Sequence, residues 1–140
     1  MSRPTSFRLP DNLLARLDDE AAARGTSVSA LVSSVLDEGL KARRFPGVVY
    51  RDGPTGRRAG IVGGPDVWEV VRALKAQSGG AEDRVRKVAA ETGLTVGQVR
   101  LAVDFYGEHA EEVDERIALD EQAAERVRAS VERRERLLSD

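Results

Sequence analysis

The chain has 140 residues, which allows one ordinary domain or two small ones, and its net charge of -2 is unevenly spread: residues 1–46 carry +1 and residues 106–140 carry -5. It contains no cysteine, which excludes disulfides, thiol catalysis and cysteine-ligated zinc. No apolar run reaches the roughly 18 residues of a membrane helix or has signal-peptide character, so we expect a cytoplasmic protein without membrane contact.

The opening residues predict one short strand. Over residues 5–9 the side chains alternate, with Phe7 on one face and Arg8 on the other. Pro10 ends the strand because proline has no N–H to donate. A lone strand leaves its backbone groups unpaired, so we expect it to pair with the same strand of a second copy.

Two amphipathic helices are expected next. The first begins near Asp11 and ends at Gly25, and Ser27 is a candidate N-cap for the second, which closes near residues 41–47. Apolar residues at helical spacing follow both segments: Leu13, Leu14, Leu17 and Ala21 in the first, and Val28, Leu31, Val32, Val35, Leu36 and Leu40 in the second. One such unit has too little core to stand alone, whereas two copies can share one.

The order strand, helix, turn, helix, with "FRLPDNLLARLD" and "RGTSVSALV", resembles the ribbon-helix-helix family of DNA-binding proteins, of the Arc, MetJ and CopG type. The resemblance covers residues 4–43. It implies an intertwined homodimer whose two-stranded ribbon enters the major groove of double-stranded operator DNA.

The resemblance also assigns contacts to DNA. Matching positions make Ser6 and Arg8 the base-contacting side chains, with Pro4 where the family often has a polar residue. Arg8 is the strongest candidate because a guanidinium can bond O6 and N7 of guanine together. Phosphate contacts fall at the start of the second helix and on one nearby basic residue: Ser27, Val28, Ser29 and Arg3.

Residues 46–107 predict a second, different unit. Residues 48–51 and 57–62 flank the turn-rich "DGPTG" and predict a β-hairpin. A helix is expected to start at residues 63–65, with Val67, Val70, Val71 and Leu74 on one face. Trp68 is interpreted as a core or interface anchor. The glycines do not have the spacing of a phosphate-binding loop.

Later in the same unit, Ala89, Gly93 and Val99 have the spacing of a helix-turn-helix, and Thr95 with Gln98 predicts a capping box. Two readings remain open. The unit is a packing or protein-binding module, which we favour because residues 79–105 are neutral, or it makes secondary DNA contacts. The residues available for such contacts are Arg51, Arg57, Arg58, Gln98 and Arg100.

Residues 108–140 predict one long helix without a breaker. Its apolar stripe, at roughly heptad spacing, consists of Val113, Ile117, Ala124, Val127, Val131 and Leu138. The stripe predicts docking on a partner's groove or on a second copy; the alternative is a solvated helix held by its own ion pairs. Its acidic pairs lack a neighbouring histidine or cysteine, which disfavours metal binding and acid–base catalysis.

Residues 45–121 are similar to a family of small hairpin-plus-helices domains that occur in bacteria beside genes for PIN-like ribonuclease toxins. This similarity implies an antitoxin.

We expect a mostly α protein with short β elements, divided into three parts. Residues 1–45 serve DNA binding and dimerisation, residues 46–107 form the hairpin plus helix-turn-helix-like domain, and residues 108–140 bind a partner. The expected function is that of a type II antitoxin, without enzymatic activity, metal or cofactor, which neutralises a PIN-like ribonuclease and represses its own operon.

An acidic helix could approach the basic cleft of a ribonuclease. The toxin-binding residues expected on this basis are Val113, Ile117, Val127, Val131, Glu111, Glu112 and Glu115. Two alternatives remain: a free-standing transcriptional regulator without a toxin, and a dimeric assembly module that does not bind DNA.

Overall fold

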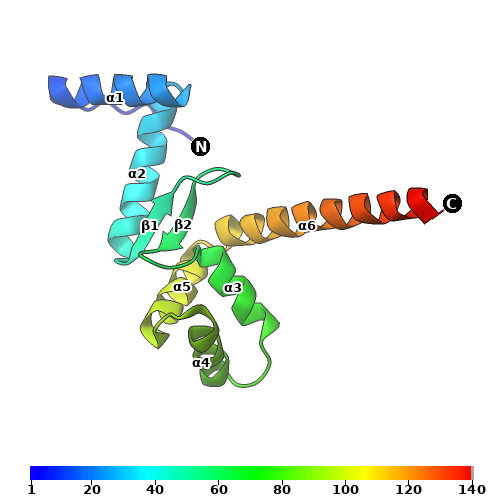
Figure 1. Cartoon of the computed structure of the whole chain (residues 1–140). Coiled ribbons are helices and arrows are strands. Elements are labelled where there is room, and N and C mark those ends of the chain that lie inside the picture. Colours follow the sequence, from blue (N-terminus) through cyan, green and yellow to red (C-terminus); the bar gives the residue numbers. More distant parts are fainter. Residues whose placement is uncertain (140) are drawn as a thin grey trace. The chain divides into compact units, whose positions relative to one another are not determined.

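The computed structural model describes residues 1–139 and divides into two compact units, Met1–Arg44 and the chain from Phe45 on. We call them the N-terminal unit and the C-terminal unit. The fold is mainly helical with one short hairpin and a long last helix, as predicted from the sequence (Figure 1). None of the helices within residues 1–139 is long and apolar enough to cross a membrane.

The N-terminal unit contains two helices, α1 (Asp11–Arg24) and α2 (Val28–Arg44). Their junction follows the local sequence signals. Gly25 ends α1 with a φ of 64°, a left-handed conformation that glycine adopts without strain. The hydroxyl of Ser27 then accepts a hydrogen bond from the N–H of Ala30 at 3.1 Å, which caps α2 as expected.

The predicted strand over residues 5–9 is not formed in the single chain: residues 1–10 have no regular secondary structure. A strand exists only where a neighbouring strand supplies its hydrogen bonds, and no other segment of residues 1–139 does so here. The local alternation of residues 5–9 is therefore insufficient by itself to form a strand, and pairing with a second copy stays a prediction.

The N-terminal unit buries little of its apolar surface. Ala21 and Leu31 are its only buried residues within the described chain, whereas Phe7 is 78% exposed and Leu40 68% exposed. Leu14 and Leu36 are exposed as well. A unit of this size cannot be stable with two buried side chains, so its exposed apolar residues indicate an interface with another chain.

The C-terminal unit begins with a hairpin of β1 (Val48–Arg51) and β2 (Arg58–Ile61). The strands are antiparallel, with Val48 opposite Ile61 and Arg51 opposite Arg58. Four helices follow: α3 (Val67–Ala76), α4 (Ala81–Thr92), α5 (Val96–Glu108) and α6 (Ala110–Ser139). The hairpin agrees with the sequence prediction to within one residue at each strand end, whereas α3 begins at Val67, a few residues after the predicted start at residues 63–65.

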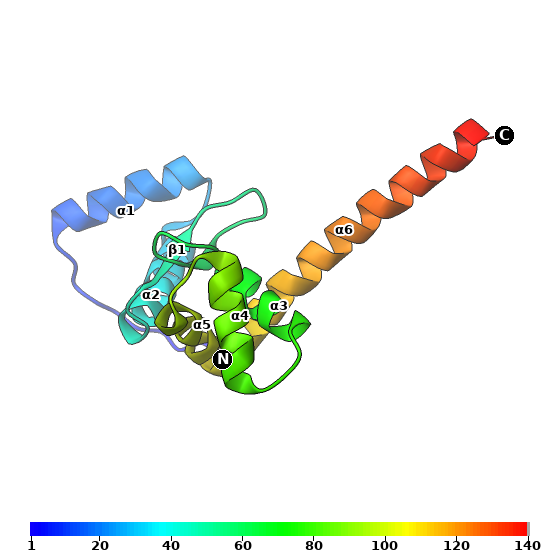
Figure 2. The same ribbon diagram turned by 60° about the horizontal axis from the view of Figure 1, so that its bottom comes forward.

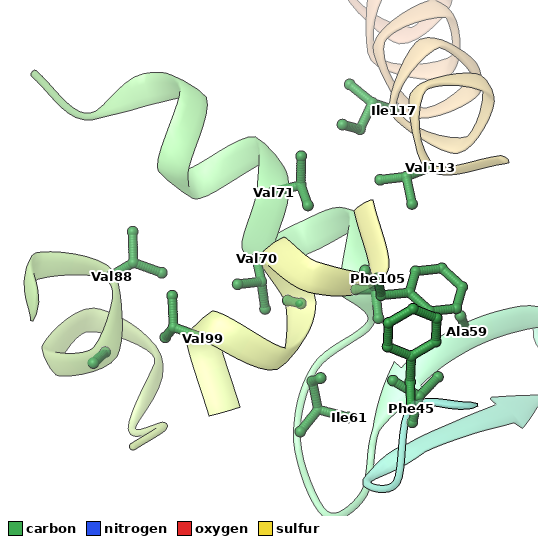
Figure 3. Packing of buried hydrophobic residues seen from close by; sticks show 14 residues of the cluster. Phe45, Ala59, Ile61, Val70, Val71, Val88, Val99, Phe105, Val113 and Ile117 are labelled. Carbon is green, nitrogen blue, oxygen red and sulfur yellow. The ribbon is translucent and has the colours of Figure 1, made fainter. Parts of the chain in front are cut away.

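One hydrophobic core joins the hairpin to all four helices (Figure 3). Val70 of α3 and Val99 of α5 are fully buried at its centre, and Phe105 packs edge-on against Phe45 with ring centroids 5.4 Å apart. Phe105 also contacts the ring of His109, which lies between α5 and α6. The core therefore extends from Phe45, the first residue of the C-terminal unit, into the first turns of α6.

The helix-turn-helix expected around Gly93 is present. Gly93 ends α4 with a φ of 72°, and Thr95 caps α5 in a capping box with Gln98. Ala89 and Val99 are both buried between the two helices and the rest of the core.

The last helix, α6, has two parts with different surroundings (Figures 1 and 2). Its first turns pack on α3 and α5 through Val113 and Ile117, so residues 108–120 belong to the C-terminal unit and do not form a separate segment. From residue 121 to 139 every side chain is exposed except the half-buried Ala129. We call residues 121–139 the free part of α6.

Candidate nucleic-acid interface and partner surface

The side chains expected to read DNA bases lie on the exposed N-terminal segment. Arg3, Pro4, Ser6 and Arg8 are all exposed, and Arg8 makes no ion pair within the described residues. Their neighbour Phe7 is exposed too, although it is a large apolar side chain. This segment thus presents both of the features that a paired ribbon needs: a free guanidinium and an apolar residue that requires burial.

The expected phosphate-binding residues lie at the start of α2. The first N–H groups of a helix have no partner inside the helix, and here the Ser27 hydroxyl occupies only that of Ala30. The N–H groups of Val28 and Ser29 therefore remain available in the first turn. That turn has no acidic side chain, so it is suited to a phosphate group.

The residues considered for secondary DNA contacts all have partners inside the C-terminal unit. Arg57 donates to Asp52 at 3.1 Å, and Arg100 donates to both carboxylate oxygens of Glu82, at 2.6 and 2.7 Å. The Gln98 side chain accepts from the N–H of Thr95.

The other two arginines of this group, Arg51 and Arg58, both pair with Asp66, and Arg51 does so at 2.6 Å. Asp66 is 7% exposed and also accepts from the Trp68 ring N–H at 3.1 Å. Their charge therefore balances a buried carboxylate. DNA binding by this set stays a prediction.

Asp66 is a residue whose importance the sequence analysis missed. It begins α3 in a capping box with Glu69, and its N–H donates to the Glu69 carboxylate at 2.8 Å. The signal was available in "DVWE", because an aspartate followed three residues later by glutamate is typical of a helix start. The two arginines on the hairpin were not predictable as its partners.

The expectation that the whole stripe of α6 faces a partner is wrong for two of its residues. Val113 is 3% exposed and Ile117 is 7% exposed, and both lie in the core of their own unit (Figure 3). Glu112 accepts a hydrogen bond from the Tyr50 hydroxyl at 2.5 Å, which ties it to the hairpin. A side chain buried against α3 cannot at the same time bind another protein.

Polar contacts reinforce this docking of α6. Lys75 of α3 donates to Asp114 at 2.9 Å, and the Tyr106 hydroxyl contacts the same carboxylate at 3.1 Å. The hydrogen bond from Lys75 lowers the pKa of Asp114, and the same bond raises the pKa of Lys75. Arg72 of α3 pairs with Asp120 one and a half turns further along α6. Beyond Asp120 no such contact holds the helix within the described residues.

The remaining expected toxin-binding residues are accessible. Glu111 and Glu115 are exposed on the docked part of α6, and Val127 and Val131 are 63% and 42% exposed on its free part. A cavity of about 240 Å³ adjoins the docked part, between β2, the start of α3 and α6. Its lining includes Ala59, Val67, Trp68, Val113, Arg116 and Leu119.

Comparison with known proteins identifies the N-terminal unit. Residues 3–41 match the family model described as ribbon-helix-helix protein, copG family. This match confirms the expected ribbon-helix-helix and supports DNA binding by a homodimer. Neither the curated proteins nor the solved structures gave a match to this chain.

Proposed function

We propose that this protein is a type II antitoxin: its N-terminal unit represses its own operon as a dimer, and its C-terminal unit neutralises a PIN-like ribonuclease. The observation that carries the proposal is the division of the chain into a ribbon-helix-helix unit and a second unit with a partly free helix. The two tasks of such an antitoxin would then lie on different parts of the chain.

The DNA-binding task is supported by the geometry of the N-terminal unit. Pairing residues 5–9 of two copies would bury Phe7 and Leu9 and leave Ser6 and Arg8 facing outward to base edges. The amides at the start of α2, together with the exposed Ser29 hydroxyl, would then hold the flanking phosphates.

The toxin-binding task rests on the similarity of residues 45–121 to domains encoded beside PIN-like ribonucleases. It is further supported by the free part of α6, because an isolated helix with an exposed apolar stripe is a common form of peptide that docks into a groove. The accessible candidates on this free part are Val127 and Val131; Glu111 and Glu115 are accessible too, but they lie on the docked part of α6.

The test uses a chain that ends at Glu121. This truncation removes the free part of α6 and keeps Val113, Ile117 and the contacts of Asp114 and Asp120, so the C-terminal unit retains its core. We expect the shortened chain to bind its upstream DNA like the full chain but to lose protection against the product of the adjacent reading frame in cells.

Two results would contradict this expectation. Full protection by residues 1–121 would show that the free part of α6 is not the inhibitor. If the full chain binds its operator but the product of the adjacent reading frame is not toxic to cells, the free-standing regulator is favoured instead.

A further inference from the structure

The free part of α6 has an apolar stripe on the same side as the docked residues Val113 and Ile117. At about 100° per residue, the apolar side chains of this stretch other than Ala129 fall within roughly 80° of Val127. They include the exposed Leu119 just before the free part, and Ala123, Ala124, Val131, Leu137 and Leu138 within it. We call this set the distal stripe.

The charges around the distal stripe differ from those of α6 as a whole. Residues 108–121 contain seven acidic residues and one basic residue, whereas residues 122–139 contain three acidic and five basic residues. On the helical wheel Arg126 and Arg133 form one border of the stripe and Arg134 lies within it. None of these three makes an ion pair within residues 1–139. Glu125 and Glu132 point to the opposite side of the helix.

A second copy of the chain is a poor occupant of the distal stripe. A parallel α6 on this side would have to run, at the level of Val113 and Ile117, through the space that α3 and α5 already fill. An antiparallel α6 overlapping only the free part avoids that clash. With residues 121–139 of the two copies fully overlapped, it would, however, bring Arg126 close to the second copy's Arg134, and like charges that face each other are destabilising.

We infer that the distal stripe docks into an apolar groove with a carboxylate rim on a different protein. The apolar side chains would fill the groove and Arg126, Arg133 and Arg134 would pair with the rim. This inference rests on the part of the proposed function in which the C-terminal unit binds a protein partner. It reverses the charge expected from the sequence, because the acidic residues of α6 lie mainly on its docked part.

The experiment measures binding of the full chain to the purified product of the adjacent reading frame at low and high salt. The double variant Arg133→Glu, Arg134→Glu should bind about tenfold or more weakly at low salt, with a smaller deficit at high salt. Val127→Asp should weaken binding at both salt concentrations because it places a charge in the apolar contact. All three positions are exposed, so the fold of the C-terminal unit should not change.

Two control variants reverse charges elsewhere on α6 and should leave binding to the partner nearly unchanged. Glu125→Arg with Glu132→Arg changes as much charge on the far side of the helix and should leave binding within about twofold. Glu111→Lys with Glu115→Lys tests the acidic residues of the docked part and should not weaken binding.

The outcomes separate this inference from the proposed function. The first case is a wild-type chain that binds the product and protects cells. If Arg133→Glu, Arg134→Glu then weakens binding no more than its control does, or less than Glu111→Lys, Glu115→Lys does, the inference is wrong and the proposed function stands. If Val127→Asp lowers the oligomeric mass of the free chain, a second copy covers the stripe and the inference is wrong. If the wild-type chain forms no complex, both are overturned.

Discussion

Shortening Ile117 to alanine separates the two possible roles of the α6 stripe. If Ile117 is a core residue, Ile117→Ala should destabilise the C-terminal unit, whereas a partner-facing residue could be shortened without cost to the free protein. The side chain is 7% exposed and packs in the cluster that contains Val113 and Val71. Replacing a buried isoleucine by alanine costs about 2–5 kcal/mol, through lost apolar transfer and the cavity left behind. Because Ile117 lies at the edge of the core, we expect about 2–3 kcal/mol.

Trp68 provides the assay. It is the only tryptophan, and it lies in the C-terminal unit, where it lines a cavity that residues of α6 also line. Its fluorescence therefore reports on the C-terminal unit and not on the N-terminal unit. Urea unfolding of the full chain followed at Trp68 should give a lower midpoint for Ile117→Ala with little change in slope. The matched control is Val127→Ala on the free part, which should change the unfolding free energy by no more than about 0.5 kcal/mol. Equal unfolding curves for Ile117→Ala and the wild type would refute the docking of α6.

Three further predictions concern other parts of the chain. Phe7→Asp should convert the dimer into monomers or unfold the N-terminal unit, because pairing would bury an unpaired charge; a dimer of unchanged mass by light scattering would rule out pairing through residues 5–9. Arg8→Ala should cost about 1–3 kcal/mol on the cognate operator and relax base preference, whereas Ser29→Ala should weaken binding to all sequences alike, as measured by anisotropy titrations on cognate and scrambled DNA. Lys75→Met should lower the stability of the C-terminal unit slightly at neutral pH. The pKa of Asp114 is lowered in the folded state, so its contribution is present above the unfolded value and is lost as pH falls through the folded one. A stability difference that persists at pH 2 would show another cause.

The features that the sequence predicted well are those set by neighbouring residues. The positive φ of Gly25 and Gly93, and the caps at Ser27 and Thr95, depend on a few residues on either side, and each was readable from them. The hairpin was predictable for the same reason, because two short β-prone runs flank a turn-rich connection.

The features that the sequence did not predict depend on distant residues. An apolar stripe shows that a helix buries one side, but it does not show whether its own domain or another protein covers that side; the structure assigns Val113 and Ile117 to the domain and leaves Val127 exposed. Likewise the sequence analysis named Arg51 and Arg58 as available for DNA contacts, whereas in the structure both pair with Asp66. The expected strand over residues 5–9 is a further case, because its predicted partner lies on another chain.

The most direct test of the central claim, that two copies of the N-terminal unit together read operator DNA, is native mass spectrometry of the full chain on its own upstream DNA, with a scrambled duplex of equal length as the control. We expect an even number of chains on each duplex, two per binding site, and a clear preference for the upstream sequence at moderate salt. A single chain per site, or equal occupancy of the two duplexes, would contradict it.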